Sequence, residues 1–156
     1  MLASQRGYLE IVHELCESGA NVNAARTNDG STALMLTIQR GHLEIVRELC
    51  ELGANVNAAR MDNGSTALMA ASEKGHLEIV RELCKRGANV NAASTDVGFT
   101  ALMLGSQNDH LKVVRELCRR GANVDAAKTN GITALMEANQ NGRLAITREL
   151  KAWRYP

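Results

Sequence analysis

Aromatic residues and an excess of either charge are both scarce in this sequence. Phe, Trp and Tyr together make up 3% of the 156 residues, too few for the stacked-ring surfaces that bind single-stranded nucleic acid. Eighteen Lys and Arg against seventeen Asp and Glu give a net charge of +1. The broad positive field typical of nucleic-acid-binding proteins is therefore missing, and we expect no nucleic-acid partner.

Long hydrophobic runs are also absent. No stretch approaches the roughly 20 apolar residues needed to cross a bilayer. Residues 1–6, Met-Leu-Ala-Ser-Gln-Arg, do not resemble a signal peptide. We therefore expect no membrane partner and an intracellular protein, cytoplasmic by default, with a nuclear location also open.

The four cysteines occupy one position that is repeated four times. Cys16, Cys50, Cys84 and Cys118 follow one another at intervals of 34 residues. Stacked helices lie about 10 Å apart, whereas Cα atoms more than about 7 Å apart cannot be joined by a disulfide. The cysteines are therefore interpreted as small apolar residues on a buried helix face, and we predict no metal and no cofactor.

One phrase recurs along the whole chain. Residues 75–92 read Gly-His-Leu-Glu-Ile-Val-Arg-Glu-Leu-Cys-Lys-Arg-Gly-Ala-Asn-Val-Asn-Ala, residues 41–58 are almost identical, and looser copies begin at Gly7, Asp109 and Gly142. Such self-similarity is typical of stacked repeats. Its apolar residues stand at three- and four-residue spacings, which predicts an amphipathic helix. The solvated outer face of this helix would carry Glu78, Arg81, Glu82 and Lys85.

A second phrase precedes each later copy of the first. Residues 30–35 read Gly-Ser-Thr-Ala-Leu-Met, with counterparts at 64–69, 98–103 and 131–136. The threonine after the glycine predicts an N-cap. The helix that follows is short, ending near Arg40, Lys74, Asn108 or Asn141. A glycine, or Asp109 in the fourth copy, then predicts a left-handed residue between two helices. So short a helix pair buries its apolar face only by stacking on its neighbours.

Together, Gly-x-Thr-x-Leu, Gly-His-x-x-Ile-Val and Gly-Ala-x-Val-Asn-Ala, at a period near 33, resemble the ankyrin repeat over essentially the whole chain. The resemblance implies an all-α, ankyrin-type α-solenoid of stacked helix-turn-helix units joined by β-turn or hairpin loops. It implies a single ankyrin-repeat domain, 1–156, with a partial first repeat 1–25, repeats at about 26–59, 60–93 and 94–127, and a C-terminal capping repeat 128–156.

Three features depart from the usual ankyrin pattern. Thr-Ala-Leu-Met replaces Thr-Pro-Leu-His, so a proline and a bridging histidine are missing; the only proline is Pro156. Flexible methionine packing is expected instead. Leu-Cys replaces Leu-Leu in the second helix. The hairpins that begin at Asn23, Asn57 and Asn91 are one residue longer than the last hairpin.

The histidines do not indicate an active site. The resemblance makes His42, His76 and His110 structural residues near the start of the second helix. The chain has no glycine-rich phosphate-binding loop, and its histidines and cysteines recur at invariant positions without a varied partner. We therefore predict that the chain is not an enzyme.

Both ends differ from the middle. Residues 1–7 align with 35–41, so we expect a truncated array that begins inside a helix and exposes apolar surface. We therefore expect a monomer that self-associates weakly through this end. In the last unit, Trp153 and Tyr155 either fold over the end of the stack or contact a partner. Polar residues there are interpreted as a terminal cap: Glu137, Asn139, Thr147 and Lys151.

Candidate binding residues are those that vary between units, because variation at positions without a packing role is what partner selection needs. The resemblance implies that partners contact the hairpin tips and first helices, on a concave surface. At the tips the candidates are Arg26, Asp29, Ser31, Arg60, Asp62, Asn63, Ser65, Asp96, Val97, Phe99 and Ile132, with Lys128 also variable. On the helices they are Gln39, Arg40, Glu73, Lys74, Gln107 and Asn108. Phe99 and Ile132, which replace serines, form either an apolar contact site or local packing between hairpins.

The leading hypothesis is a protein–protein interaction scaffold without catalysis, whose partner the sequence does not identify. The near identity of the second and third units also fits an engineered or consensus-like repeat binding protein. A repeat fragment of a larger effector, with its activity elsewhere, is a further alternative. A basic strip leaves salt-sensitive nucleic-acid binding as a weaker one: Arg26, Arg40, Arg60, Lys74 and Lys128.

Overall fold

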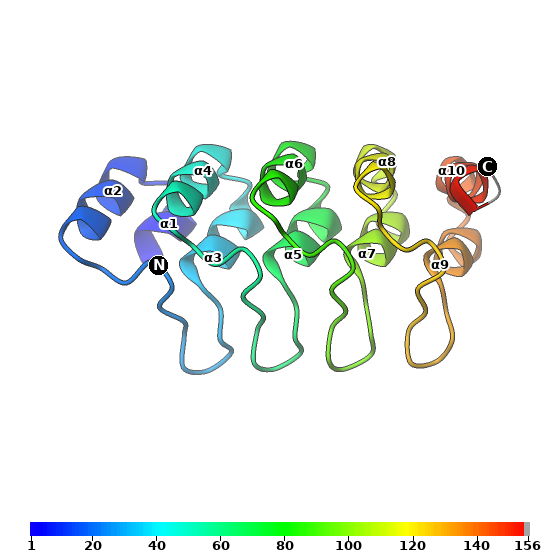
Figure 1. Ribbon diagram of the computed structural model, residues 1–156, viewed down its shortest axis with the longest axis horizontal. Coiled ribbons are helices and arrows are strands. Elements are labelled where there is room, and N and C mark those ends of the chain that lie inside the picture. Colours follow the sequence, from blue (N-terminus) through cyan, green and yellow to red (C-terminus); the bar gives the residue numbers. More distant parts are fainter. Residues whose placement is uncertain (155–156) are drawn as a thin grey trace.

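Ten short helices pair into a row of helical hairpins in the computed structural model, which describes residues 1–154. The second helix of each pair lies in one layer, the first helix in another, and loops project beyond the first helices (Figure 1). The first helices are α1 (Leu2–Arg6), α3 (Ala33–Arg40), α5 (Ala67–Lys74), α7 (Ala101–Gln107) and α9 (Ala134–Gln140). The second, or outer, helices are α2 (Leu9–Glu17), α4 (Leu43–Glu51), α6 (Leu77–Lys85), α8 (Leu111–Arg119) and α10 (Leu144–Arg154). The predicted all-helical solenoid is confirmed, and over residues 1–154 no helix has the length and apolarity to span a membrane.

The repeated threonines cap the first helices as predicted. In α3 the hydroxyl oxygen of Thr32 accepts a hydrogen bond from the backbone N–H of Met35 at 3.4 Å, and α5, α7 and α9 begin in the same way. Gly41 and Gly75 follow α3 and α5 with φ angles of 75° and 73°. Asp109 occupies the equivalent position after α7 with φ of 64°. The predicted left-handed residues between paired helices are therefore confirmed.

Methionine packing replaces the polar bridge of the usual pattern in three units. Met35, Met69 and Met103 are 5%, 1% and 0% exposed. Met136 is 49% exposed, because it lies on α9, the last of the described first helices. Methionine is flexible enough to fill the irregular space between adjacent units.

The outer helices bury the predicted apolar residues. Ile79, Val80 and Leu83 of α6 are 2%, 0% and 0% exposed and belong to one core that runs along the stack. The four cysteines are free, with Cys118 buried and the other three half-buried. Burial raises the pKa of Cys118 to about 11, so its thiol stays protonated at neutral pH. Their role as small apolar residues is confirmed.

The prediction of a fully solvated outer face is wrong for Glu82. Glu78 is exposed, but Glu82 is only 9% exposed. Arg86 Nε donates to Glu82 Oε1 at 2.8 Å, and Arg47 Nε of the preceding outer helix lies 3.8 Å from Glu82 Oε2. Glu116 makes the equivalent contacts in α8. These glutamates link neighbouring units, a contact that spacing within one helix does not reveal.

Backbone hydrogen bonds join adjacent hairpin loops. The Thr95 N–H, for example, donates to the carbonyl of Asn63 in the preceding loop at 2.9 Å. In the three longer loops the glycine N–H donates to the carbonyl four residues back, whereas Gly131 donates three residues back, to Lys128. The additional residue of the three longer loops therefore lies inside the turn that this hydrogen bond closes.

Large apolar side chains are exposed on the N-terminal helix pair, as predicted. Leu2, Ile11 and Leu15 are 62%, 47% and 47% exposed. The residues equivalent to Ile11 and Leu15 in the next unit, Ile45 and Leu49, are 2% and 1% exposed, since α1 and α2 pack against that unit.

The polar residues that were predicted to form a terminal cap differ in their exposure. Lys151 is exposed, while Thr147 is 8% exposed and donates through Oγ1 to Asn139 Oδ1 at 3.0 Å. Glu137 is also buried, at 7% exposed, and its carboxylate contacts the Lys128 ammonium of its own hairpin loop. Thr147 and Glu137 thus both have partners within the last unit, and the terminal cap stays a prediction.

The two aromatic residues predicted at the C-terminal end have different outcomes. Trp153 lies on α10 with 42% of its surface exposed, and its indole N–H donates to Glu149 Oε1 at 3.1 Å. Tyr155 lies outside the described residues. The contact of Trp153 thus lies one turn back along its own helix.

Candidate interaction surface

The hairpin loops and the helices α3, α5, α7 and α9 lie on one side of the stack, called the inner face below (Figure 1). The predicted binding residues that are exposed are Arg26, Gln39, Arg40, Asp62, Glu73, Lys74, Asp96, Val97 and Asn108. Those that are half-buried are Asp29, Arg60, Asn63, Ser65, Phe99, Gln107 and Ile132. Ser31 differs from the expectation for a loop tip, because it is 2% exposed. It lies at the base of the loop, where its carbonyl accepts the Arg26 N–H.

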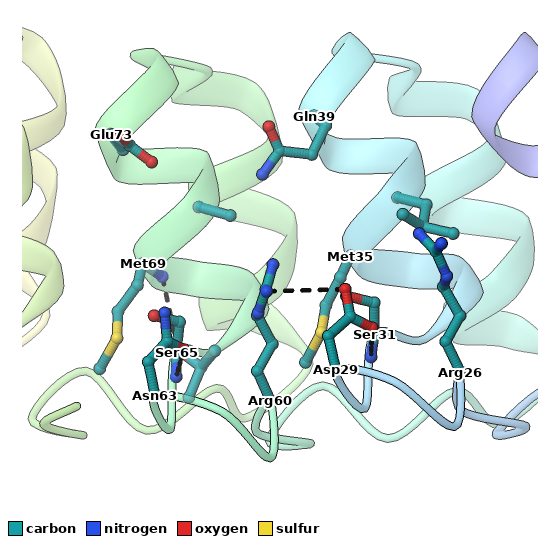
Figure 2. A pocket seen from close by; sticks show the side chains of 13 residues that line it. Arg26, Asp29, Ser31, Met35, Gln39, Arg60, Asn63, Ser65, Met69 and Glu73 are labelled. Atoms are coloured by element: carbon teal, nitrogen blue, oxygen red, sulfur yellow. Dashed lines mark hydrogen bonds and ion pairs between the residues drawn. The ribbon is translucent and has the colours of Figure 1, made fainter. Parts of the chain in front are cut away.

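A cavity of about 250 Å³ opens on the inner face between α3 and α5 (Figure 2). This α3–α5 pocket brings together predicted residues from two units. Its polar lining includes Arg26, Asp29, Gln39, Arg60, Asn63 and Glu73. Its apolar lining consists of Met35, Leu36, Met69 and Ala70.

Arg60 lies at the loop side of this pocket, next to Asp29 (Figure 2), and also pairs with Asp62. Its Nε donates to Asp62 Oδ1 at 2.9 Å, and its Nη2 lies 3.5 Å from Asp29 Oδ2. The hydrogen bond from the Ser31 backbone N–H lowers the pKa of Asp29, and the Arg60 charge lowers it further. The Arg60 hydrogen bond likewise lowers the pKa of Asp62. Both carboxylates are thus stabilised as anions, and the arginine charge is balanced within the protein.

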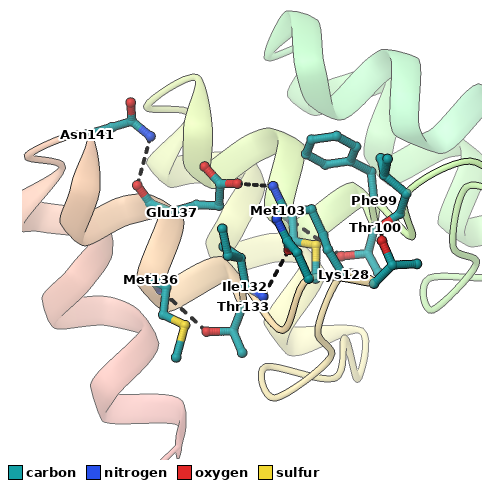
Figure 3. A network of polar contacts seen from close by, with 12 residues as sticks. Phe99, Thr100, Met103, Lys128, Ile132, Thr133, Met136, Glu137 and Asn141 are labelled. Carbon is teal, nitrogen blue, oxygen red and sulfur yellow. Dashed lines mark hydrogen bonds and ion pairs between the residues drawn. The ribbon is translucent and has the colours of Figure 1, made fainter.

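A buried ion pair lies on the inner face between the last two loops (Figure 3). The Lys128 ammonium contacts the Glu137 carboxylate, and their side chains are 10% and 9% exposed. The ammonium nitrogen also lies 4.4 Å from the centre of the Phe99 ring, which is a cation–π distance. Phe99 and Ile132 are both half-buried, and Phe99 packs against the core. For Phe99 this arrangement favours local packing between hairpins over a free apolar contact site.

The histidines contact the preceding unit. His76 packs on Gly41, and His110 packs on Gly75. A Cβ added to Gly41 would lie 3.0 Å from the His76 ring, and a Cβ added to Gly75 would lie 2.5 Å from the His110 ring. His110 Nε2 lies 2.9 Å from the carbonyl oxygen of Glu73. Burial, aided by the neighbouring His110, lowers the pKa of His76. This placement agrees with the structural role that the resemblance implies. Across residues 1–154, no three His, Cys, Asp or Glu side chains lie together as a metal site requires.

Ser31 and Ser65 were selected from the sequence, but Ala70, a further small residue in the lining of the pocket, was missed. Most of the selected residues were charged or polar, apart from Val97, Phe99 and Ile132, and Ala70 was not among them. The equivalent residues in other units are Leu36, Leu104 and Glu137, which are all larger. A small residue at one copy of an otherwise large position was the signal available in the sequence.

Comparison with known proteins agrees with the geometry. A family model described as Ankyrin repeats (3 copies) matches residues 1–94 and again residues 92–153. The two matches together extend from α1 into the last turn of α10. No curated protein matches the chain.

Proposed function

Since the chain belongs to the ankyrin repeat family, we propose that it is a protein-interaction scaffold whose partner contacts the inner face. Ankyrin repeats are generally protein-binding modules without catalysis. The proposed contact residues are the loop and helix residues placed on the inner face above. We propose no cofactor and no chemical step for them.

The observation that carries this proposal is a set of exposed polar side chains without partners inside the protein. In the described part of the chain, no side-chain hydrogen bond or ion pair is formed by Arg26, Gln39, Arg40, Glu73 or Lys74. They come from two neighbouring units and lie on one face. On the outer helices Arg47, Arg81 and Arg115 each pair with a glutamate of the next unit, although the exposed Lys85 and Lys112 there form no such pair within residues 1–154. The unpaired groups of the inner face are available to a partner.

Charge reversal on the two faces tests the proposal. The variant Arg40→Glu with Lys74→Glu changes the inner face, and Lys85→Glu with Lys112→Glu makes the same charge change on α6 and α8. Both variants alter exposed positions, so both are expected to fold. Affinity capture from lysate should lose its specific protein with the first variant and retain it with the second. The opposite pattern would place the contact on the outer helices and contradict the proposal.

We also propose weak self-association of an otherwise monomeric chain through its N-terminal helix pair. The supporting observation is the exposure of Leu2, Ile11 and Leu15 on one unit, since contiguous apolar surface promotes association. The variant Ile11→Gln with Leu15→Gln should remove any increase of apparent mass with concentration in light scattering. An increase that persists in this variant would exclude this end as the contact.

For location, we propose an intracellular environment. The supporting observation is that Cys16, Cys50, Cys84 and Cys118 are all free thiols, and disulfide formation is rare in reducing compartments. Imaging of the tagged protein in its native cells tests this, and a secreted protein would contradict it.

A further inference from the structure

One ion pair is repeated between each outer helix and the next. Its copies are His13–Glu48, Arg47–Glu82, Arg81–Glu116 and Arg115–Glu149. The N···O distances of the four pairs lie between 2.7 and 3.8 Å. In each pair the basic residue lies on the side of its unit toward the C-terminal end of the stack, and the glutamate lies on the side toward the N-terminal end.

Each end of the stack carries one half of this pair. Helices α2 and α10 lie at opposite ends of the row (Figure 1). On α2 the glutamate position is held by Glu14, and on α10 the basic position is held by Arg148. Both residues are exposed, and within residues 1–154 neither side chain forms a hydrogen bond or an ion pair. The N-terminal end thus presents an acceptor, and the C-terminal end presents the matching donor.

Lys151 adds a second positive charge at the C-terminal end. It occupies the position that the other outer helices give to cysteine, and it is exposed. Burial raises the pKa of the Cys118 thiol, and the charge of Glu149 on the next outer helix raises it further. This position therefore faces the glutamate of the following unit. In a further unit stacked in the same way, Lys151 would lie near the glutamate that Arg148 faces.

A second kind of contact is also divided between the two ends. At the first three interfaces a histidine ring packs on the glycine that follows the first helix of the preceding unit, as His42 does on Gly7. In the N-terminal unit Tyr8 occupies the histidine position and is 50% exposed. In the last unit Gly142 occupies the glycine position, and an added Cβ there would meet no atom of the described residues within 4 Å. One end thus offers an exposed ring, and the other offers an uncovered glycine.

Both ends also expose apolar side chains that neighbouring units cover elsewhere in the stack. Met136 on α9 is 49% exposed, whereas the equivalent methionines of the three preceding units are 5% exposed or less. Ile11 and Leu15 on α2 are exposed, and their equivalents one unit later are buried. The two end surfaces therefore carry the apolar groups of an interior interface as well as its charges.

The charges of the end helices favour contact between unlike ends. Helix α2 carries three glutamates and one histidine, whereas α10 carries three basic residues and one glutamate. Two N-terminal ends brought together would place like charges opposite each other, and so would two C-terminal ends. One end of each kind places opposite charges together, which favours that pairing.

We propose that the protein binds a second copy of itself head to tail, with the N-terminal unit of one copy stacked on the C-terminal unit of the other. Glu14 of one copy pairs with Arg148 and Lys151 of the other, and Tyr8 packs on Gly142. The contact uses different surfaces on the two copies, so each added copy leaves a free end and the assembly does not close. This inference rests on the proposed self-association through the N-terminal helix pair, and it identifies the surface which that pair contacts.

Exchanging the charges of the two ends tests this pairing. The head variant is Glu14→Arg, and the tail variant is Arg148→Glu with Lys151→Glu. Each places like charges opposite each other in the proposed contact, so each should weaken self-association by about tenfold or more. A variant with all three substitutions carries the same pairing with its charges exchanged and should recover most of the loss. An equimolar mixture of the head and tail variants should also associate, because each supplies the charge that the other needs.

Light scattering and sedimentation velocity over a range of protein concentrations measure the association. At low salt the apparent mass of the wild type should rise beyond that of two copies without levelling off, and added salt should reduce it. The control is Glu10→Arg with Lys112→Glu, which changes a repeat position that is exposed in every unit. The control should behave as the wild type does. All the substituted residues are exposed, and thermal melting establishes that each variant is folded before its mass is measured.

The two self-association proposals fail in different ways. If the mass of the wild type levels off at two copies, or if the tail variant associates as the wild type does, the head-to-tail contact is overturned. Self-association through the N-terminal helix pair then still stands if Ile11→Gln with Leu15→Gln abolishes it. A wild type that stays monomeric at every concentration overturns both proposals. A folded triple variant that associates no better than the head variant overturns the pairing of Glu14 with Arg148 and Lys151.

Discussion

The Arg143 guanidinium reaches back across the last interface between units to Asp109, with Nη1 3.7 Å from Oδ2. At the three preceding interfaces the same two positions hold a glycine and a histidine, and the imidazole packs directly on the glycine. Both residues change together at the last interface. An ion pair thus replaces a ring-on-glycine contact, and the left-handed backbone at position 109 is retained with φ of 64°.

Asp109→Gly is predicted to stabilise the protein slightly. A non-glycine residue in the left-handed region costs about 1 kcal/mol, less for Asp than for most residues. The exposed pair with Arg143 contributes only about 0.5 kcal/mol in return. The melting temperature should therefore rise by about 1–2 °C. A clear fall would mean that the Asp109–Arg143 pair outweighs the backbone strain.

Gly75→Ala is predicted to destabilise more than Gly142→Ala. Both glycines have positive φ, so both substitutions cost about 1 kcal/mol in backbone strain. Only at Gly75 would the new Cβ meet another residue, His110, at 2.5 Å. We expect a total of about 2–3 kcal/mol at Gly75, measured by urea denaturation. In a His110→Ala background the two costs should become equal to within about 0.5 kcal/mol; a difference that persists would assign the cost to something other than the ring.

Glu137→Leu is predicted to be strongly destabilising on its own, although leucine stands at the equivalent positions 36 and 104. It would leave the Lys128 ammonium buried without its carboxylate, at a cost of about 3 kcal/mol. Adding Lys128→Ser, which reproduces the Ser94 and Leu104 combination of the preceding unit, should recover most of the loss. Equal stability of the single and double variants in chemical denaturation would show that the pair is not the cause.

The N-terminal helix pair is predicted to dock more firmly at pH 6 than at pH 8. His13 Nδ1 lies 2.7 Å from Glu48 Oε1 of the next unit, and Nε2 lies 3.1 Å from Glu17 Oε1. The hydrogen bond to Glu48 and the charge of Glu17 raise the pKa of His13 above its ordinary value. A pKa that is raised in the folded state adds stability. This stability is fully present below about pH 6.5, the pKa of an unfolded histidine, and is lost as the pH rises through the pKa of the folded state.

Hydrogen-exchange protection factors in α2 measure this effect, and His13→Gln is the control. Protection should fall between pH 6 and pH 8 in the wild type and stay level in the variant. His76 has the opposite sign, because burial lowers its pKa and its protonation below about 6.5 opposes folding. If the protection of α2 still depends on pH in the His13→Gln variant, the His13–Glu48 contact is not its cause.

Much of the fold was determined by the sequence itself, because the residue patterns that specify caps and turns occur in several units. The glycine–threonine phrase specified the N-caps at Thr32, Thr66, Thr100 and Thr133, and the intervening glycines specified left-handed turns. Asp109 was identified as left-handed by its place in the repeat. Such features depend on residues close in sequence, where the identity of a side chain fixes the backbone it favours.

Contacts between units were decided only by the tertiary structure. Glu82 looked solvated on its own helix, yet an arginine 35 positions earlier reaches it from the preceding unit. Glu137 was predicted as part of a polar end cap from its own repeat, and only the structure shows its buried contact with Lys128. The α3–α5 pocket is lined by Ser31 from one unit and by Ser65 and Ala70 from the next. Periodicity gives the direction of a side chain within its own repeat, but burial, pairing and cavities depend on which side chain the next repeat places opposite it.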